Sequence, residues 1–216
     1  FNLEFPINIL NIGGIANITA TIDWKDSLSI NKIQAYDIGP GNCLIDKWVR
    51  KNSKKNYDKG GFLAKSGKTD QLILNQALEN FNENLHFEKS LDVKDFDIFF
   101  AKGLSLENGA ATITDFTAKL IANGMNYVHN ANQKEIYNWL VCGGGRKNNY
   151  LLESIKNNFE QINIELIDKY KVDGDFIESQ AFAFLAIRSL EKMPISFPST
   201  TRCKKPTSGG IVVENF

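Results

Sequence analysis

The sequence predicts an α/β fold in which a mixed sheet is flanked by helices. Three observations support this fold class. Three strand-like runs precede the first helix-like stretch, a long amphipathic stretch occupies the middle of the chain, and strand-like and helix-like stretches alternate after it. Hydrophobic residues make up 43% of the 216 residues, which is enough apolar surface to bury a core.

The charge and cysteine content argue against several classes of protein. Lys plus Arg and Asp plus Glu both number 25, so there is no basic excess for a nucleic-acid surface. No apolar run approaches the length of a membrane-spanning helix. The cysteines Cys43, Cys142 and Cys203 are widely spaced, so we expect neither a disulfide framework nor a zinc site. These features predict a cytoplasmic protein without a nucleic-acid or membrane partner.

The first strands are expected to form a hairpin. Residues 7–12 and 15–22 are apolar runs on either side of Gly13 and Gly14, a pattern typical of two strands joined by a tight turn. Residues 29–36 alternate apolar and polar side chains and predict a third strand. The Gly-Gly turn either only reverses the chain or presents N–H groups to an anion such as phosphate. It is not a P-loop, because no G-K-[ST] follows.

The stretch Tyr36-Asp37-Ile38-Gly39-Pro40-Gly41-Asn42 connects the third strand to a helix over residues 43–51. Asn42 stands where its side chain can cap that helix. Asp37 stands at the strand end, where open α/β sheets bind ligands. Two interpretations of Asp37 stay open: a carboxylate that only satisfies backbone amides, or one that faces a ligand.

The remaining elements follow from helical periodicity and from turn residues. Ser105 is expected to cap a long helix whose buried stripe is Ile113, Phe116, Leu120, Ile121, Met125 and Val128. Further helices are predicted over residues 69–80, 150–159 and 176–190, and strands over 139–142 and 162–167. In the last helix the inward residues are expected to be Ile177, Ala181, Phe184 and Leu185.

Three consecutive glycines, Gly143, Gly144 and Gly145, lie between a predicted strand and a predicted helix. Such a run is costly unless something lies against the backbone. With a helix N-terminus behind it, the turn suits the adenosine or phosphate of a nucleotide. Glu178 falls in the first turn of the last helix, where a ligand contact and a favourable interaction with the helix dipole are both open explanations.

The order of these elements resembles the ribonuclease-H-like lobe of the actin-like ATPases and sugar kinases. More closely, the sequence resembles the anhydro-N-acetylmuramic acid kinase family, through motifs that lie in family order along nearly the whole chain. These motifs are N-I-G-G-I-A-N-I-T at 11–19, Y-D-I-G-P-G-N-C-L-I-D at 36–46, Y-D-K-G-G at 57–61, V-C-G-G-G-R-K-N at 141–148, D-G-D-F-I-E-S-Q-A-F-A at 173–183 and P-T-S-G-G at 206–210.

The resemblance implies an ATP-dependent kinase that opens 1,6-anhydro-N-acetylmuramic acid with water and phosphorylates it to N-acetylmuramic acid 6-phosphate, in the recycling of cell-wall peptidoglycan. ATP and Mg²⁺ are the implied cofactors, and no residue is assigned as a metal ligand. Asp37 corresponds to the catalytic base. The implied substrate-binding residues are Gly39, Gly41, Asn42 and Glu178. The implied nucleotide-binding residues are Asn11, Gly13, Gly14, Asn17, Gly143, Gly144 and Gly145.

The resemblance also implies that residues 1–216 are the C-terminal portion of a two-lobed sugar kinase. A hairpin and catalytic-Asp region would occupy 1–105, and a nucleotide-side region with the Gly-Gly-Gly turn 106–216. The family's G-T-S-x-D-G phosphate motif is absent from the sequence. We therefore expect the chain to need an N-terminal portion, and we expect a homodimer that acts on a small sugar. A truncated or degenerate non-catalytic remnant of the fold and a kinase for another sugar are the alternatives.

Overall fold

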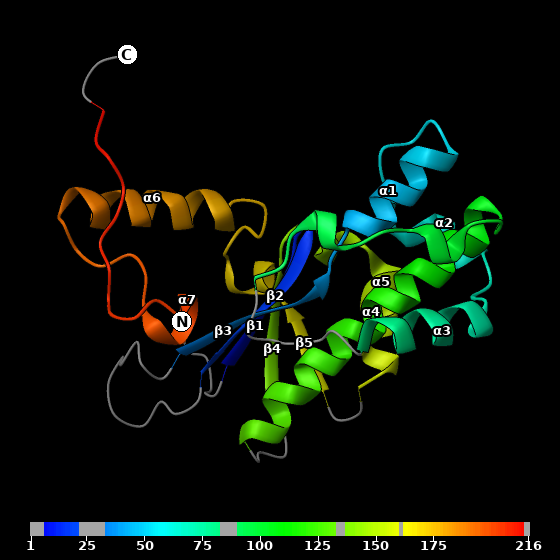
Figure 1. Cartoon of the computed structure of the whole chain (residues 1–216), viewed down its shortest axis with the longest axis horizontal. Coiled ribbons are helices and arrows are strands. Elements are labelled where there is room, and N and C mark those ends of the chain that lie inside the picture. Colours follow the sequence, from blue (N-terminus) through cyan, green and yellow to red (C-terminus); the bar gives the residue numbers. More distant parts are fainter. Residues whose placement is uncertain (1–6, 22–32, 83–89, 133–136, 160–161, 214–216) are drawn as a thin grey trace.

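A computed structural model of the chain describes residues 7–21, 33–82, 90–132, 137–159 and 162–213 (Figure 1). Its centre is one five-stranded sheet with the strand order β3-β2-β1-β4-β5. The strands are β1 Ile7–Ile12, β2 Ile15–Thr21, β3 Ile33–Pro40, β4 Tyr137–Cys142 and β5 Ile162–Leu166. The first three strands form an antiparallel meander, whereas β4 and β5 run parallel to β1. The predicted α/β class is confirmed, and the strand order is that of a ribonuclease-H-like lobe.

Helices follow the strands in the predicted order. The α-helices are α1 Cys43–Asn52, α2 Phe62–Ser66, α3 Gln71–Asn82, α4 Leu106–Asn132, α5 Asn149–Asn157, α6 Ile177–Leu190 and α7 Pro198–Thr201. Short 3-10 turns are η2 Lys59–Gly61, η3 Val93–Asp95, η4 Phe99–Ala101, η5 Gly144–Lys147 and η6 Ile167–Tyr170. The one-turn helix α7 was not predicted, because four residues carry too little periodicity to show in the sequence.

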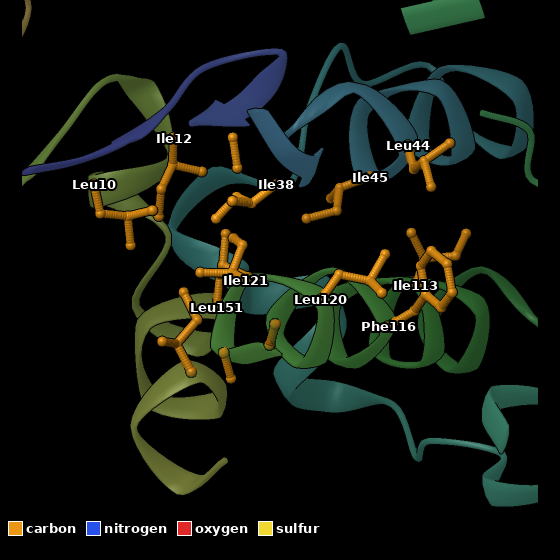
Figure 2. Packing of buried hydrophobic residues seen from close by; sticks show 14 of the residues in the cluster. Leu10, Ile12, Ile38, Leu44, Ile45, Ile113, Phe116, Leu120, Ile121 and Leu151 are labelled. Carbon is orange, nitrogen blue, oxygen red and sulfur yellow. The ribbon is translucent and has the colours of Figure 1, made fainter. Parts of the chain in front are cut away.

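The core lies between the sheet and α4, which also packs against α1, α2, α3 and α5. Ser105 caps α4 as predicted, with its Oγ accepting a hydrogen bond from the Asn108 N–H at 3.2 Å. The predicted apolar stripe of α4 is buried throughout. Figure 2 shows how its side chains meet those of β3 and α1; the residues involved are Ile38, Leu44, Ile45, Ile113, Leu120 and Ile121.

Two predictions around the third strand need correction. Strand β3 continues through Asp37 to Pro40, so Asp37 lies within the strand, opposite Asn17 of β2, and not in a loop after it. Proline is tolerated there because β3 is an edge strand. Residues 29–32 of the predicted strand lie outside the described part of the chain. Asn42 does not cap α1 with its side chain. Its amide instead donates to the carbonyl of Gly13 at 3.2 Å, an acceptor that the hairpin turn brings close.

Helix α6 does not pack as predicted. Of its expected inward residues, Ala181 and Phe184 are exposed, and Phe184 is 58% accessible. Within the described residues, none of the α6 side chains is buried. Figure 1 shows α6 separated from helices α1 to α5. The expectation failed because apolar residues lie around the whole circumference of α6, so the sequence alone does not single out an inward face.

No helix in the described ranges has both the length and the apolar composition that crossing a bilayer requires.

Candidate functional site

The sheet has a switch point between its two central parallel strands. Strands β1 and β4 lie side by side, and Asn11 is paired with Cys142 at their carboxyl ends. After β1 the chain continues to β2, and after β4 it continues through α5 to β5. In the sheet, β2 and β5 lie on opposite sides of the β1–β4 pair. Crevices at such points are the usual ligand sites of open α/β sheets. Both glycine-rich turns predicted from the sequence start at this edge.

The hairpin turn and the start of α1 are joined by backbone hydrogen bonds. The N–H groups of Gly41 and Asn42 donate to the carbonyls of Gly14 and Gly13 at 2.9 and 2.8 Å, and the Cys43 N–H donates to Gly14 at 3.2 Å. These bonds use amides that the first turn of a helix otherwise leaves unpaired. The α1 N-terminus is therefore fixed against the hairpin, and Gly13, Gly14, Gly41 and Asn42 come together.

The Gly-Gly-Gly turn lies directly against β1. Gly143 has a φ of +77°, and a Cβ there would come within 2.4 Å of Asn11 Oδ1 and 2.7 Å of the Ile12 carbonyl. Only glycine fits such a position without displacing β1. After the turn, Asn148 caps α5 by accepting a hydrogen bond from the Leu151 N–H at 3.0 Å. The Gly-Gly-Gly turn and Asn11 therefore form one packed unit.

A cavity of about 200 Å³ opens beside these turns. It is lined by Asn42, Ile45, Asp46, Tyr57, Asp58, Gly60, Gly144, Lys147 and Asn148. The lining comes from three motifs that lie far apart in the sequence, namely 36–46, 57–61 and 141–148. Burial raises the pKa of the Asp46 carboxyl, and the charge of Arg50 partly opposes this rise.

The loop over residues 57–61 is the part of this cavity to which the sequence interpretation assigned no role. Asp58 is buried, and its two carboxylate oxygens accept hydrogen bonds from the N–H groups of Leu63 and Ala64 at 2.8 and 3.0 Å. These are amides of the first turn of α2, so Asp58 fixes this loop to α2. The signal available in the sequence was the Y-D-K-G-G motif itself.

Asp37 does not line this cavity. Its side chain is partly buried on β3, and its Oδ2 accepts a hydrogen bond from the Leu91 N–H at 2.9 Å. Asn17 stands opposite it on β2, next to an irregularity in the strand pairing at Ala16. Gly39 faces the core, where a Cβ would lie 3.3 Å from the Leu120 Cβ.

Glu178 approaches the hairpin turn from α6. A Cβ placed on Gly13 would lie 4.0 Å from Glu178 Oε1. Burial raises the pKa of the Cys142 thiol to about 11, with the charge of Arg146 opposing the rise and the charge of Glu178 adding to it. Thus α6, although it packs poorly, brings a carboxylate to the edge where β1 and β4 end.

A larger cavity lies elsewhere in the described part of the chain. It measures about 480 Å³ and is lined mainly by residues of α3 and of the segment 95–100, with Phe116 contributed by α4. None of the predicted site residues contributes to it. Among the described residues there is also no group of three or more His, Cys, Asp or Glu side chains that could hold a metal ion.

A mixed sheet in this strand order, with glycine turns after its two central parallel strands, defines a lobe of the actin-like ATPase and sugar-kinase fold. Residues 2–215 match the model of the family described as anhydro-N-acetylmuramic acid kinase. The chain belongs to this family.

Relatives that carry the name anhydro-N-acetylmuramic acid kinase match nearly the whole chain. Those from Pelagibacter ubique, Rhodospirillum rubrum and Brucella canis are 49%, 36% and 37% identical over 99%, 96% and 98% of this chain. The matches cover 56%, 53% and 54% of the relatives, so the chain spans about half their length. Among solved structures, an activator of 2-hydroxyisocaproyl-CoA dehydratase from Clostridium difficile with bound ADPNP matches with a TM-score of 0.43 and 13% identity, over 76% of this chain and 55% of that one.

Proposed function

We propose that this chain carries the ATP- and sugar-binding lobe of a kinase that opens 1,6-anhydro-N-acetylmuramic acid and phosphorylates it to N-acetylmuramic acid 6-phosphate. Membership of the family supports the reaction class. The observation that carries the proposal for this chain is the cavity at the switch point, which draws its lining from three separate family motifs.

The nucleotide is proposed to bind along the two glycine turns. Gly13 and Gly14, with Asn11 and Asn17, would lie by the phosphates, and Gly143 to Gly145 by the nucleoside. The backbone fits this role, since Gly14 is exposed and the nearest atom to a Cβ there is 3.8 Å away on Val93. Lys147 lies at the cavity wall, where its Nζ donates a hydrogen bond to Asp175 at 2.5 Å. Mg²⁺, when bound with ATP, would neutralise phosphate charge during transfer.

Asp37 is proposed as the general base. Its carboxylate takes a proton from water as the water oxygen bonds to the anomeric carbon of the sugar and the bridging C–O bond breaks. The freed sugar oxygen then attacks the terminal phosphorus of ATP, and ADP leaves. The hydrogen bond from the Leu91 N–H orients the carboxylate. Glu178, Asn42 and the backbone at Gly39 and Gly41 are proposed to hold the sugar.

The test is a coupled ADP-release assay with 1,6-anhydro-N-acetylmuramic acid and Mg–ATP. It is run with the chain alone and with the remainder of the Pelagibacter ubique relative supplied in trans. Turnover is expected in at least one arm.

The variant Asp37→Asn should lose turnover, while its ATP binding measured by calorimetry should stay unchanged. The matched control is Asp97→Asn, an exposed aspartate that does not line the site cavity and should keep turnover. No turnover in either arm, or full turnover of Asp37→Asn, would contradict the proposal.

A second candidate is a non-catalytic remnant of the fold. The uncovered apolar side chains of α6, such as Phe182 at 71% exposure, favour this alternative because they leave part of the fold without a packing partner among the described residues. Calorimetry and thermal unfolding with Mg–ATP separate the two candidates. Absence of both binding heat and a thermal shift favours the remnant.

A further inference from the structure

Arg146 is a buried arginine directly after the Gly-Gly-Gly turn, with 4% of its side chain exposed. Its Nε and Nη2 donate to the two oxygens of Asp168 at 2.8 and 3.0 Å, in the bidentate geometry that suits a guanidinium. Its Nη1 donates to Asp175 at 2.8 Å and to the Gly143 carbonyl at 3.1 Å. A third carboxylate, that of Asp173, lies 3.9 Å from Nη2. One side chain thus joins the glycine turn, η6 and the turn before α6.

The guanidinium is committed to the protein. An arginine next to a glycine-rich turn is a common phosphate ligand, but here carboxylates occupy its donors. Hydrogen bonds from Arg146 and Lys147 lower the pKa of Asp175 to about 2, and Arg146 also lowers the pKa of Asp168. The ion pairs therefore persist at neutral pH, and the role of Arg146 is to hold chain segments together.

The backbone of Gly174 lies directly against the Arg146 guanidinium. A Cβ on Gly174 would lie 2.4 Å from Nε and 2.7 Å from Cζ of Arg146. The backbone of the turn before α6 therefore lies against the guanidinium at a distance that a larger residue would not allow. The Gly174 N–H also points to Asp168, at 3.4 Å from Oδ1.

Among the residues that the structure describes, no α6 side chain is buried, and the hydrogen bonds from α6 side chains to the following chain come from its last turn, where Arg188 donates to the Pro194 carbonyl at 2.7 Å and Ser189 donates to the Gly209 carbonyl. The Arg146 contacts are made with residues 173–175, directly before the first turn of α6. Glu178 lies in that first turn, next to the hairpin glycine Gly13. The position of Glu178 therefore depends on a polar anchor that starts at the Gly-Gly-Gly turn.

We infer that Arg146 is a positioning residue that holds the turn 173–175, and with it Glu178, in fixed register with the turn 143–145. Given the proposed function, on which this role rests, the nucleotide-facing turn and the sugar-facing carboxylate are joined through one buried guanidinium. Arg146 itself contacts neither substrate.

The anchor is tested by amide hydrogen exchange on the ligand-free chain. In Arg146→Gln and in Asp175→Asn, amides of residues 174–180 should exchange at least about tenfold faster, because a charged hydrogen bond is lost. Amides of α5 should keep their wild-type rates.

The control Arg50→Gln removes an exposed arginine, 3.9 Å from Asp46, and should leave the exchange rates of residues 174–180 unchanged. If Arg146→Gln does not fold, Asp175→Asn decides, because that carboxylate is 48% exposed and its loss leaves the Arg146–Asp168 pair intact. Wild-type exchange of residues 174–180 in folded Asp175→Asn overturns the inference.

The link to Glu178 is tested by kinetics. In the ADP-release assay, Asp175→Asn should raise KM for the anhydro sugar about tenfold, since the α6 side of the anchor is released together with the hydrogen bond from Lys147 to Asp175. Faster exchange with an unchanged sugar KM would overturn the link. If the wild-type chain shows no turnover in either arm, the proposed function has failed, and the exchange experiment still decides whether Arg146 anchors α6.

Discussion

At the scale of single residues, Gly143 is constrained both by its backbone conformation and by the strand beside it. It combines a left-handed φ of +77° with a β1 carbonyl 2.7 Å from any added Cβ. Gly143→Ala is expected to destabilise the fold by about 1–3 kcal/mol, because strained backbone and overpacking both add to the cost. Thermal unfolding monitored by circular dichroism measures this change.

The neighbouring glycine is a matched control. Gly144→Ala adds the same methyl group, but the nearest atom to it is Asn42 Nδ2 at 3.8 Å. Its unfolding temperature should stay close to that of the wild type. Equal losses in the two variants would show that the close approach to β1 is not what requires glycine at position 143.

The contacts of the Asn42 side chain could not be predicted from the sequence. Asn42 was placed correctly at the start of α1, but its side chain bonds the hairpin carbonyls and not the helix amides. The competing acceptors come from residues about 30 positions away. No local rule gives such a contact. For the same reason the sequence assigned no role to the cavity residues Asp46 and Tyr57. The glycine turns could be identified from the sequence, because runs of glycine lose much conformational entropy on folding and are rare without a structural reason.

At the scale of elements, α4 organises the core. Leu120 is fully buried on it, facing Gly39 of β3. Leu120→Ala should cost about 2–5 kcal/mol, because the cavity left behind adds to the lost burial of apolar surface. Chemical denaturation provides the measurement, and the same substitution at Leu72, which is 83% exposed on α3, is the control. A loss at position 72 as large as that at position 120 would contradict the central role of α4.

Elements with strong local signals were predicted within a few residues. The hairpin has a glycine turn between two apolar runs, and α4 has both a cap and a long 3.6-residue period. The orientation of α6 was not predictable, since its apolar side chains do not define a face and none of its side chains is buried by the described part of the chain. Tertiary packing, and not helix propensity, usually fixes a helix of this length.

At the scale of the whole molecule, both halves of the chain contribute to one sheet. β1 and β4, which flank the switch point, come from opposite sides of the expected division at residue 105. That division stays a prediction, and it separates sequence regions that share the candidate site. The site therefore forms only when the parallel pairing between β1 and β4 is complete, a contact between residues about 130 positions apart.

Because of the ion pairs around Arg146, the whole molecule is expected to lose stability as the pH falls into the acid range. The folded-state pKa of Asp175 is about 2, below its usual value near 3.8, so its contribution to stability is complete above that usual value and is lost as the pH falls toward 2. Asp168 shifts in the same direction. The melting temperature of the wild type should therefore fall between about pH 4 and pH 2, and that of Asp175→Asn should fall less steeply over this range. Leu120→Ala lowers stability without removing a titrating group, so its melting temperature should fall with pH as steeply as that of the wild type. If the melting temperature of Asp175→Asn also falls as steeply as that of the wild type, this carboxylate does not stabilise the fold through Arg146.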